Sequence, residues 1–149
     1  MTTAKQMTLM VAIPGAGKST LAAQMKATAE AKGKTCVICS TDDQFIINGS
    51  YQFNPSLLFK NHLANQNKAR DACREGINSV IIDNTNLNAK HRQVYEEIAA
   101  EFGYDCTTIV VGEFTPEFAK VCAERNRHGV PLESILRMAR SVQLPQKSG

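Results

Sequence analysis

A glycine-rich run at residues 12–19 constrains this chain more than any other feature. It reads Ala-Ile-Pro-Gly-Ala-Gly-Lys-Ser. An apolar, strand-like segment at residues 8–13 leads into it, and residues 18–31 leave it with apolar side chains at helical spacing. This order of strand, tight turn and helix places the turn at a helix N-terminus, where backbone N–H groups and the helix dipole favour an anion. The pattern therefore predicts a phosphate-binding loop (P-loop).

The individual positions of this loop have distinct chemical roles. Gly15 and Gly17 allow backbone N–H groups to turn toward phosphate oxygens. Lys18 supplies a mobile positive charge for the β- and γ-phosphates, and the Ser19 hydroxyl is a hard oxygen ligand suited to Mg²⁺. Ala12 stands where the motif usually has its first glycine. The expected cofactors are ATP and Mg²⁺, and the expected cofactor-binding residues are Pro14, Gly15, Ala16, Gly17, Lys18, Ser19 and Thr20.

Composition fits one ordinary globular domain. The chain has 149 residues, of which 43% are hydrophobic and 21% charged. No apolar stretch approaches the roughly 20 residues that cross a bilayer, so we expect no membrane contact. The five cysteines are odd in number and scattered, which favours reduced thiols and a cytoplasmic location. Cys36 and Cys39 lie three apart in a strand-like run and should therefore face opposite sides, unable to chelate a metal together.

Strand-like and helix-like segments alternate along the chain. Strands are expected over residues 8–13, 35–40, 80–83 and 106–111, and helices over residues 18–31, 57–75, 90–102, 116–124 and 132–142. Such alternation predicts a three-layer α/β/α fold with a mostly parallel sheet of four or five strands. Residues 145–149 are expected to fray. Ligands of such sheets bind beyond the carboxyl ends of the strands, so the residues that follow each strand matter most.

Two carboxylates follow the second expected strand. An attacking hydroxyl must be oriented and must lose its proton during phosphoryl transfer, and a carboxylate within hydrogen-bond distance does both. We assign this role of general base to Asp42, with Asp43 beside it as an acceptor-binding residue. The alternative is that both merely cap the next segment. Tyr51, a little further on, is a candidate for stacking on a base, or it packs the following helix.

A polar segment follows the third expected strand. Asp83 ends an apolar run, the position at which a carboxylate supports Mg²⁺ in nucleotide-binding enzymes of this type. Asn84, Thr85 and Asn86 add neutral donors and acceptors that suit gripping a polar acceptor. Turn chemistry is the alternative, because such side chains readily bond to nearby backbone.

Basic residues gather in the C-terminal part of the chain. The net charge is +3, and residues 116–149 account for the whole excess. This hints at contact with phosphates of ATP or nucleic acid, or else reflects a solvated surface. Arg125 and Arg127 stand in a short connection, residues 125–131, that we expect to form a lid. A guanidinium there matches the charge on a transferring phosphoryl group, although either could be an ordinary surface cation.

Several motifs occur together and in a fixed order. They are residues 14–20, 40–43, 51–55, 65–66, 81–88 and 125–131. Their sequence resembles the kinase domain of phage 5′-hydroxyl polynucleotide kinase. It is still more similar to the P-loop kinase-like domain of related vertebrate ubiquitin-ligase-binding proteins. The resemblance covers nearly the whole chain and implies a single P-loop kinase domain over residues 1–149. It also implies ATP and Mg²⁺, Asp42 as base and an arginine of residues 125–127 on the phosphates.

One departure affects the acceptor. The phage enzyme has an arginine three residues past the base that holds the phosphate following the acceptor sugar, and Phe45 stands there in this chain. We expect ATP-dependent transfer to a hydroxyl on nucleic acid, in the first place the 5′ end of DNA or RNA. No obligate protein partner is inferred. The alternatives are another alcohol (a hydroxymethylated base in DNA, a nucleoside or a small molecule) or a nucleotide-dependent regulatory ATPase module.

Overall fold

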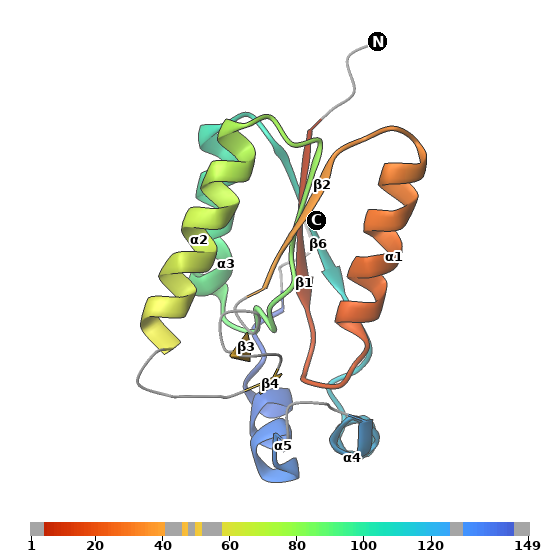
Figure 1. Cartoon of the computed structure of the whole chain (residues 1–149). Helices are drawn as coiled ribbons and strands as arrows, with labels where there is room; N and C mark the ends of the chain where they lie inside the picture. The colour runs from red at the N-terminus through yellow and green to blue at the C-terminus, as the bar shows by residue number, and fades with distance from the viewer. Residues whose placement is uncertain (1–4, 41–45, 48–49, 52–57, 126–129, 145–149) are drawn as a thin grey trace, which may run out of the picture.

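Four strands form one parallel sheet in the computed structural model, which describes residues 5–40, 46–47, 50–51, 58–125 and 130–144. They are β1 (Gln6–Val11), β2 (Cys36–Cys39), β5 (Ser79–Ile82) and β6 (Asp105–Val110). Their order across the sheet is β2-β5-β1-β6 (Figure 1). All neighbouring pairs are parallel, which confirms the fold class expected from the alternation of strands and helices.

Alternation along the strands divides the buried side chains between the two faces of the sheet. Leu9 lies beside Ile82 in the register of β1 and β5, and both belong to one apolar cluster. Met10 and Ile81 belong to a second cluster on the opposite face. Cys36 lies in this second cluster and Cys39 in the first, so the two thiols face opposite sides as expected. All five cysteines of the chain are thiols.

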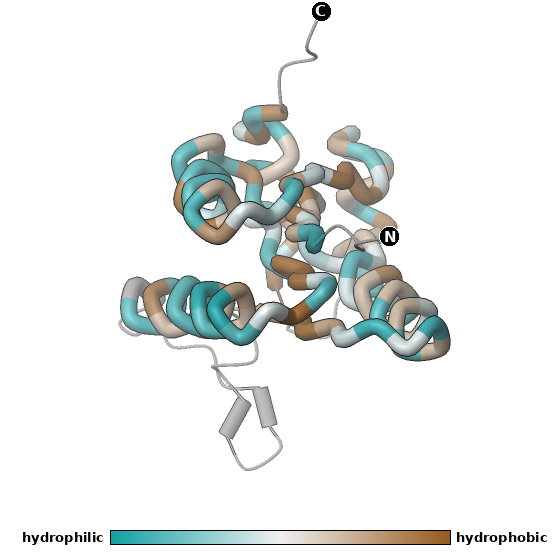
Figure 2. The backbone as a smooth tube through the Cα atoms, turned by 90° about the horizontal axis from the view of Figure 1, so that it is seen from above, coloured by the Kyte–Doolittle hydropathy of each residue, from teal (hydrophilic) through white to brown (hydrophobic). Residues whose placement is uncertain are grey.

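Helices cover both faces of the sheet. α1 (Lys18–Ala31) lies on one face, against β2 and β5. α2 (Leu58–Arg74) and α3 (Ala89–Glu101) lie side by side on the other (Figure 1). Seen from above in Figure 2, the apolar strands lie between these more hydrophilic helices. The observed bounds of α1 agree with the expected residues 18–31, and those of α2 and α3 differ by one residue at each end.

The last two helices form a separate apolar cluster at the carboxyl end of the sheet. α4 (Pro116–Arg125) and α5 (Leu132–Ser141) pack against each other there (Figure 1). α4 begins where the Thr115 hydroxyl accepts a hydrogen bond from the backbone N–H of Phe118 at 3.1 Å, a conventional N-terminal cap. Five buried residues make up the cluster, namely Ile13, Ala119, Cys122, Ile135 and Ala139. Ile13 belongs to the P-loop run, so α4 and α5 support the loop from below.

A small hairpin was not expected from the sequence. β3 (Ile46–Ile47) pairs antiparallel with β4 (Ser50–Tyr51), in a sheet of its own. Strands of two residues are too short to produce a recognisable alternation of apolar and polar positions.

Five helices lie within the described residues. None of the helices there has both the length and the apolar character that a crossing requires. α2, with 17 residues, is rich in asparagine, lysine and arginine.

Candidate active site

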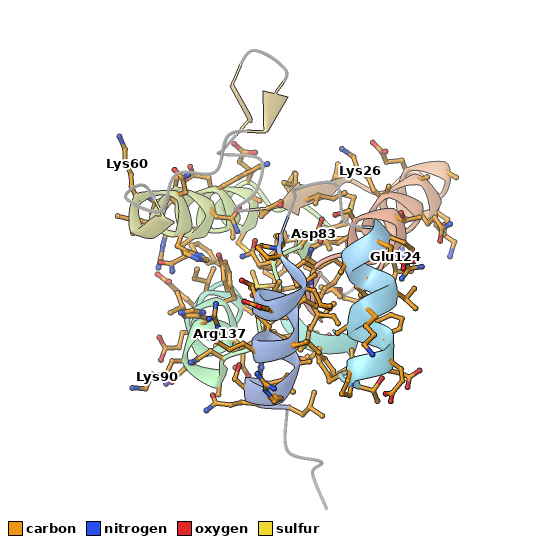
Figure 3. All side chains as sticks on the ribbon, turned by 90° about the horizontal axis from the view of Figure 1, so that it is seen from below. Lys26, Lys60, Asp83, Lys90, Glu124 and Arg137 are labelled. Carbon is orange, nitrogen blue, oxygen red and sulfur yellow. The ribbon has the colours of Figure 1, made fainter. Side chains whose placement is uncertain are left out.

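The candidate site lies at the carboxyl ends of β1 and β5. Here the P-loop follows β1, and a second loop, residues 83–88, leads from β5 to α3; we call it the β5–α3 loop. Figure 3 views the molecule from this end, with Asp83 near the centre of the view, α5 below it and α4 to its right. This is the position at which parallel α/β sheets bind ligands.

Two glycines of the P-loop have backbone angles that favour glycine. Gly15 has φ +85° and Gly17 has φ +102°. A Cβ atom at Gly15 would also lie 2.4 Å from the carbonyl oxygen of Cys122, because α4 passes directly against the loop. At Gly17 nothing lies within 4 Å of such a Cβ, so only its backbone conformation calls for glycine. Gly17 also begins α1, since its carbonyl accepts the N–H of Leu21 at 3.1 Å.

Lys18 is the first residue of α1 and is largely buried, with 7% of its surface exposed. Its ammonium group forms no ion pair within the described part of the chain. The first turn of α1 carries no acidic residue that would offset the helix dipole. The N-terminus of α1 is therefore a place where an anion would be electrostatically favoured.

Ser19 and Asp83 meet across the site. The Ser19 hydroxyl donates a hydrogen bond of 3.0 Å to a carboxylate oxygen of Asp83, which is 5% exposed. The backbone N–H of Asp83 is fixed in turn by the carbonyl of Cys39 at 2.9 Å. A hydroxyl and a carboxylate are the oxygen donors that Mg²⁺ takes from proteins alongside phosphate oxygens and water. The donor set thus fits the metal role expected for both residues.

The β5–α3 loop is pinned to the end of β1. The backbone N–H of Ala12 donates to the carbonyl of Thr85 at 3.1 Å. The side-chain amide of Asn86 donates to the carbonyls of Met10 at 2.7 Å and Ile82 at 3.3 Å. Asn86 has φ +49°, in the left-handed region that asparagine tolerates better than most residues. Asn86 was expected either to bind an acceptor or to bond to nearby backbone, and in the structure its side chain bonds to backbone carbonyls.

A buried network joins Asn84 to α2 and α3. The Tyr95 hydroxyl accepts hydrogen bonds from the amides of Asn65 at 3.0 Å and Asn84 at 3.4 Å. Burial raises the pKa of Tyr95, and the two amide bonds oppose the shift only in part. The phenol therefore stays protonated. Sequence analysis did not identify this network, because Asn65 and Tyr95 lie 30 residues apart.

Arg92 is a buried cation next to the same loop. It lies in the first turn of α3 and is 5% exposed. Its guanidinium donates to the carbonyl of Asn86 at 2.8 Å and forms no ion pair in the described residues. Burying a charge without a counterion costs free energy, so this arginine is a functional candidate as well as a loop support. The sequence carried no signal for it beyond its place in a helix.

Comparison with known proteins identifies the family. A family model described as an AAA domain (AAA_33) matches residues 7–145. The chain belongs to this AAA domain family. It is 38% identical over 135 residues to human NEDD4-binding protein 2, which confirms the resemblance drawn from the motifs. Those residues make up 91% of this chain but 7% of the human protein.

Solved structures show the same fold. The Mycobacterium tuberculosis APS kinase CysC, solved with AMPPNP and APS, has a TM-score of 0.66 and 16% identity, over 98% of this chain and 86% of that one. A chain of the Pnkp1/Rnl/Hen1 complex has a TM-score of 0.61 and 19% identity, over 99% and 43%. A Sinorhizobium meliloti gluconokinase has a TM-score of 0.61 and 14% identity, over 99% and 80%. This AAA_33 domain therefore has the P-loop kinase-like fold.

Arg125, one of the two expected lid arginines, ends α4 of this AAA_33 domain. It is exposed, and its guanidinium carbon lies 5.8 Å from the centre of the Phe118 ring. Burial raises the pKa of the Cys122 thiol, while a hydrogen bond from Arg125 opposes that shift. The Arg125 side chain therefore packs against its own helix. It lies one turn after Cys122, whose backbone carbonyl lies against Gly15 of the P-loop.

Four predicted site residues cannot be compared with the structure. Asp42, Asp43 and Arg127 lie outside the described residues, as does the side chain of Tyr51, whose backbone belongs to β4. Their assigned roles remain predictions. Among the described residues no cluster of three or more histidine, cysteine or acidic side chains could hold a metal.

The segment after α5 returns to the β5–α3 loop. The side-chain oxygen of Gln143 accepts the backbone N–H of Ala89 at 2.9 Å, and the backbone N–H of Gln143 donates to Leu87 at 2.8 Å. These bonds hold the end of α5 beside the start of α3. Sequence analysis missed this contact, because Gln143 and Ala89 are 54 residues apart.

Proposed function

We propose that this AAA_33 domain is an ATP- and Mg²⁺-dependent kinase that transfers the γ-phosphate to the 5′-hydroxyl of a polynucleotide. The observation that carries this proposal is the Ser19–Asp83 hydrogen bond of 3.0 Å beside the buried Lys18, at the carboxyl end of the sheet. Three groups suited to magnesium and phosphate thus converge where this fold binds ligands.

The P-loop accounts for the ATP half of the proposal. Backbone N–H groups around Gly15 and Gly17 bind the phosphates, and the Lys18 ammonium pairs with the β- and γ-phosphates. Ser19 and Asp83 hold Mg²⁺, which when bound neutralises charge on the phosphate oxygens. The structure solved with AMPPNP has the same fold, which is consistent with nucleotide binding.

The reaction needs a base and a group that stabilises the phosphoryl charge. Asp42 orients the acceptor hydroxyl and takes its proton as the bond from that oxygen to the γ-phosphorus forms. The bond from the γ-phosphorus to the bridging oxygen breaks, and ADP leaves. Arg125 or Arg127 stabilises the charge on the transferring group. We assign acceptor contacts to Asp43, Tyr51, Asn84 and Thr85.

The choice of a polynucleotide as the acceptor is supported by the combined order of the motifs. The order of the segments between residues 14 and 131 resembles that of a 5′-hydroxyl polynucleotide kinase, and the Pnkp1/Rnl/Hen1 chain shares the fold. Phe45 favours the second candidate, a kinase for another alcohol, because the arginine expected to bind the acceptor phosphate is missing there. The fold is also shared by an APS kinase and a gluconokinase, so it is compatible with different acceptors.

A transfer assay tests the acceptor. The purified chain is incubated with γ-labelled ATP, Mg²⁺ and separate acceptors, namely single-stranded DNA and RNA with free 5′-hydroxyls, hydroxymethyluracil DNA, and nucleosides. We expect label at 5′ ends. Label within the DNA strand or on nucleosides would favour the second candidate. Bound nucleotide without transfer to any acceptor would instead point to a regulatory module.

Two neighbouring carboxylates provide a matched test of the base. We expect Asp42→Asn to lower transfer by about 10²- to 10⁴-fold, the usual contribution of a general base, while leaving ATP affinity nearly intact. The comparison variant, Asp43→Asn, removes the same charge one residue away; as an acceptor contact it should raise the KM for the acceptor but leave kcat nearly unchanged. Wild-type turnover in Asp42→Asn would overturn the assignment.

A further inference from the structure

The charges of α3 run against its helix dipole. Lys90 and Arg92 lie in its first turn, whereas Glu96, Glu97 and Glu101 lie in its second half. Basic side chains in the first turn and acidic ones in the last turn are unfavourable for the helix dipole. α2 also has a lysine, Lys60, and no acidic residue in its first turn. In the described residues, the first turns of both helices thus carry basic and no acidic side chains, at the carboxyl end of the sheet.

Ion pairing differs between the two ends of these helices. The two ion pairs found among the described residues, Arg70–Glu101 and Arg74–Asp71, use the C-terminal parts of α2 and α3. Lys60 and Lys90, at the other end, are exposed and form none in that part of the chain. Of the basic residues of α2 and α3, Arg70 and Arg74 are thus paired at the amino end of the sheet, while Lys60 and Lys90 at its carboxyl end face solvent.

The exposed basic residues at the carboxyl edge lie on neighbouring helices. The rings of His62 on α2 and His91 on α3 lie 5.6 Å apart, and the Gln143 bonds hold α5 against the start of α3. Figure 3 shows Lys60, Lys90 and Arg137 along one side of this end, with Glu124 on the opposite side by α4. We call the exposed residues Lys60, Lys90, His91 and Arg137 the basic edge.

The buried Arg92 strengthens the field of the basic edge. Arg92 lies in the same first turn of α3 as Lys90 and His91, and in the described residues its guanidinium bonds to the Asn86 carbonyl and forms no ion pair. A charge in a low-dielectric environment without a counterion acts over a longer distance than a solvated one. The basic edge spans α2, α3 and α5 at the same end of the sheet as Asp83, which lies nearer the centre of the view in Figure 3.

We propose that the basic edge is the path of the acceptor strand, binding its phosphodiester backbone downstream of the reacting hydroxyl. This inference rests on the proposed function. The cations are spread over three helices instead of converging on one point, which fits a single-stranded polynucleotide with successive phosphates and not a small anion. The basic edge would also replace the phosphate-binding arginine that is absent at Phe45, because the acceptor phosphates would be bound by α2 and α3 instead.

Salt-dependent binding tests the path. The probe is a fluorescein-labelled oligothymidylate, whose affinity is measured by anisotropy at several KCl concentrations. Lys60→Gln/Lys90→Gln should bind it about tenfold more weakly or worse. The slope of log affinity against log salt should become shallower by about 0.7 for each lysine, the value for single strands. Lys5→Gln/Lys34→Gln, which removes two exposed lysines outside the basic edge, is the matched control and should bind like wild type.

Kinetics separates this inference from the proposed function. In the double variant the KM for the oligonucleotide should rise, while kcat and the KM for ATP stay unchanged. If wild type phosphorylates 5′ ends and the variant behaves like its control, the path is wrong and the function stands. If wild type transfers no phosphate but the variant still loses salt-dependent binding, the function fails and the surface stands. If oligoglutamate binds as strongly as oligothymidylate, and loses as much affinity in the double variant, the assignment to nucleic acid is overturned.

Discussion

Asp83 is the residue on which the proposed metal site depends most. Its carboxylate accepts the Ser19 hydroxyl at 3.0 Å and is almost fully buried. Asp83→Asn preserves shape but removes the negative charge, so the affinity for Mg²⁺ in the presence of ADP should fall at least about 10- to 100-fold. Calorimetric titration of ADP at several Mg²⁺ concentrations measures this without any transfer assay. Asp105→Asn, an exposed site on β6, is the control. An unchanged Mg²⁺ dependence in Asp83→Asn would remove Asp83 from the metal site.

Asn86 illustrates how one side chain can fix a functional loop. Its amide donates to two carbonyls while its backbone sits at φ +49° and 3% of its surface is exposed. Asn86→Asp places a carboxylate against both carbonyls and should cost about 3–5 kcal/mol of stability. Asn86→Gly loses the bonds but relaxes the backbone, so we expect about 1–2 kcal/mol. Urea unfolding measures both. A glycine variant less stable than the aspartate variant would contradict this account.

Residues of the site differ in how far the sequence could predict them. The placement of Lys18 and Ser19 at the start of α1 was predictable because it depends on a local pattern of strand, turn and helix. Asp83 was predictable because it directly follows an apolar strand. The roles of Asn65 and Arg92 depend on distant partners or on burial, as in the Asn65–Tyr95 bond between α2 and α3. A single sequence carries no record of such contacts.

The elements were predicted well where their periodicity is long. The bounds of α1 agree with the expectation, because its apolar positions repeat over 14 residues. The first strand was placed too late: residues 12 and 13 are buried, but β1 ends at Val11 and they already belong to the turn. The β3–β4 hairpin was missed because its strands have two residues each. The runs of apolar residues thus predicted which residues are buried better than they predicted where the strands end.

The contact between the P-loop and α4 provides a test at the scale of elements. Gly15→Ala must resolve a 2.4 Å contact with the Cys122 carbonyl in addition to a positive φ, whereas Gly17→Ala must resolve only the φ. Both should lose about 1–2 kcal/mol from the left-handed backbone, and Gly15→Ala should lose more. The additional loss of stability in Gly15→Ala should appear as faster hydrogen exchange in α4. Equal exchange in both variants would mean that α4 does not support the loop.

In the molecule as a whole, the site has two sides, the P-loop and the β5–α3 loop, and a different apolar cluster supports each. The cluster of α4 and α5 supports the P-loop, and the larger cluster beneath α2 and α3 supports the β5–α3 loop. Hydrogen bonds from Ala12 to Thr85 and from Ser19 to Asp83 connect the two sides. A ligand that bridges both loops should therefore stabilise the complete domain and not one helix.

Thermal unfolding tests this coupling. A non-hydrolysable ATP analogue with Mg²⁺ at about 100 times its Kd should add about 2.7 kcal/mol to the free energy of unfolding. For a domain of this size that corresponds to a rise in Tm of about 5–10 °C. Lys18→Ala should abolish the rise, because the buried ammonium is the main positive charge at the P-loop. Lys32→Ala, an exposed lysine at the other end of α1, should retain it. A wild-type Tm that ignores the analogue would refute nucleotide binding, and with it every role assigned to the P-loop.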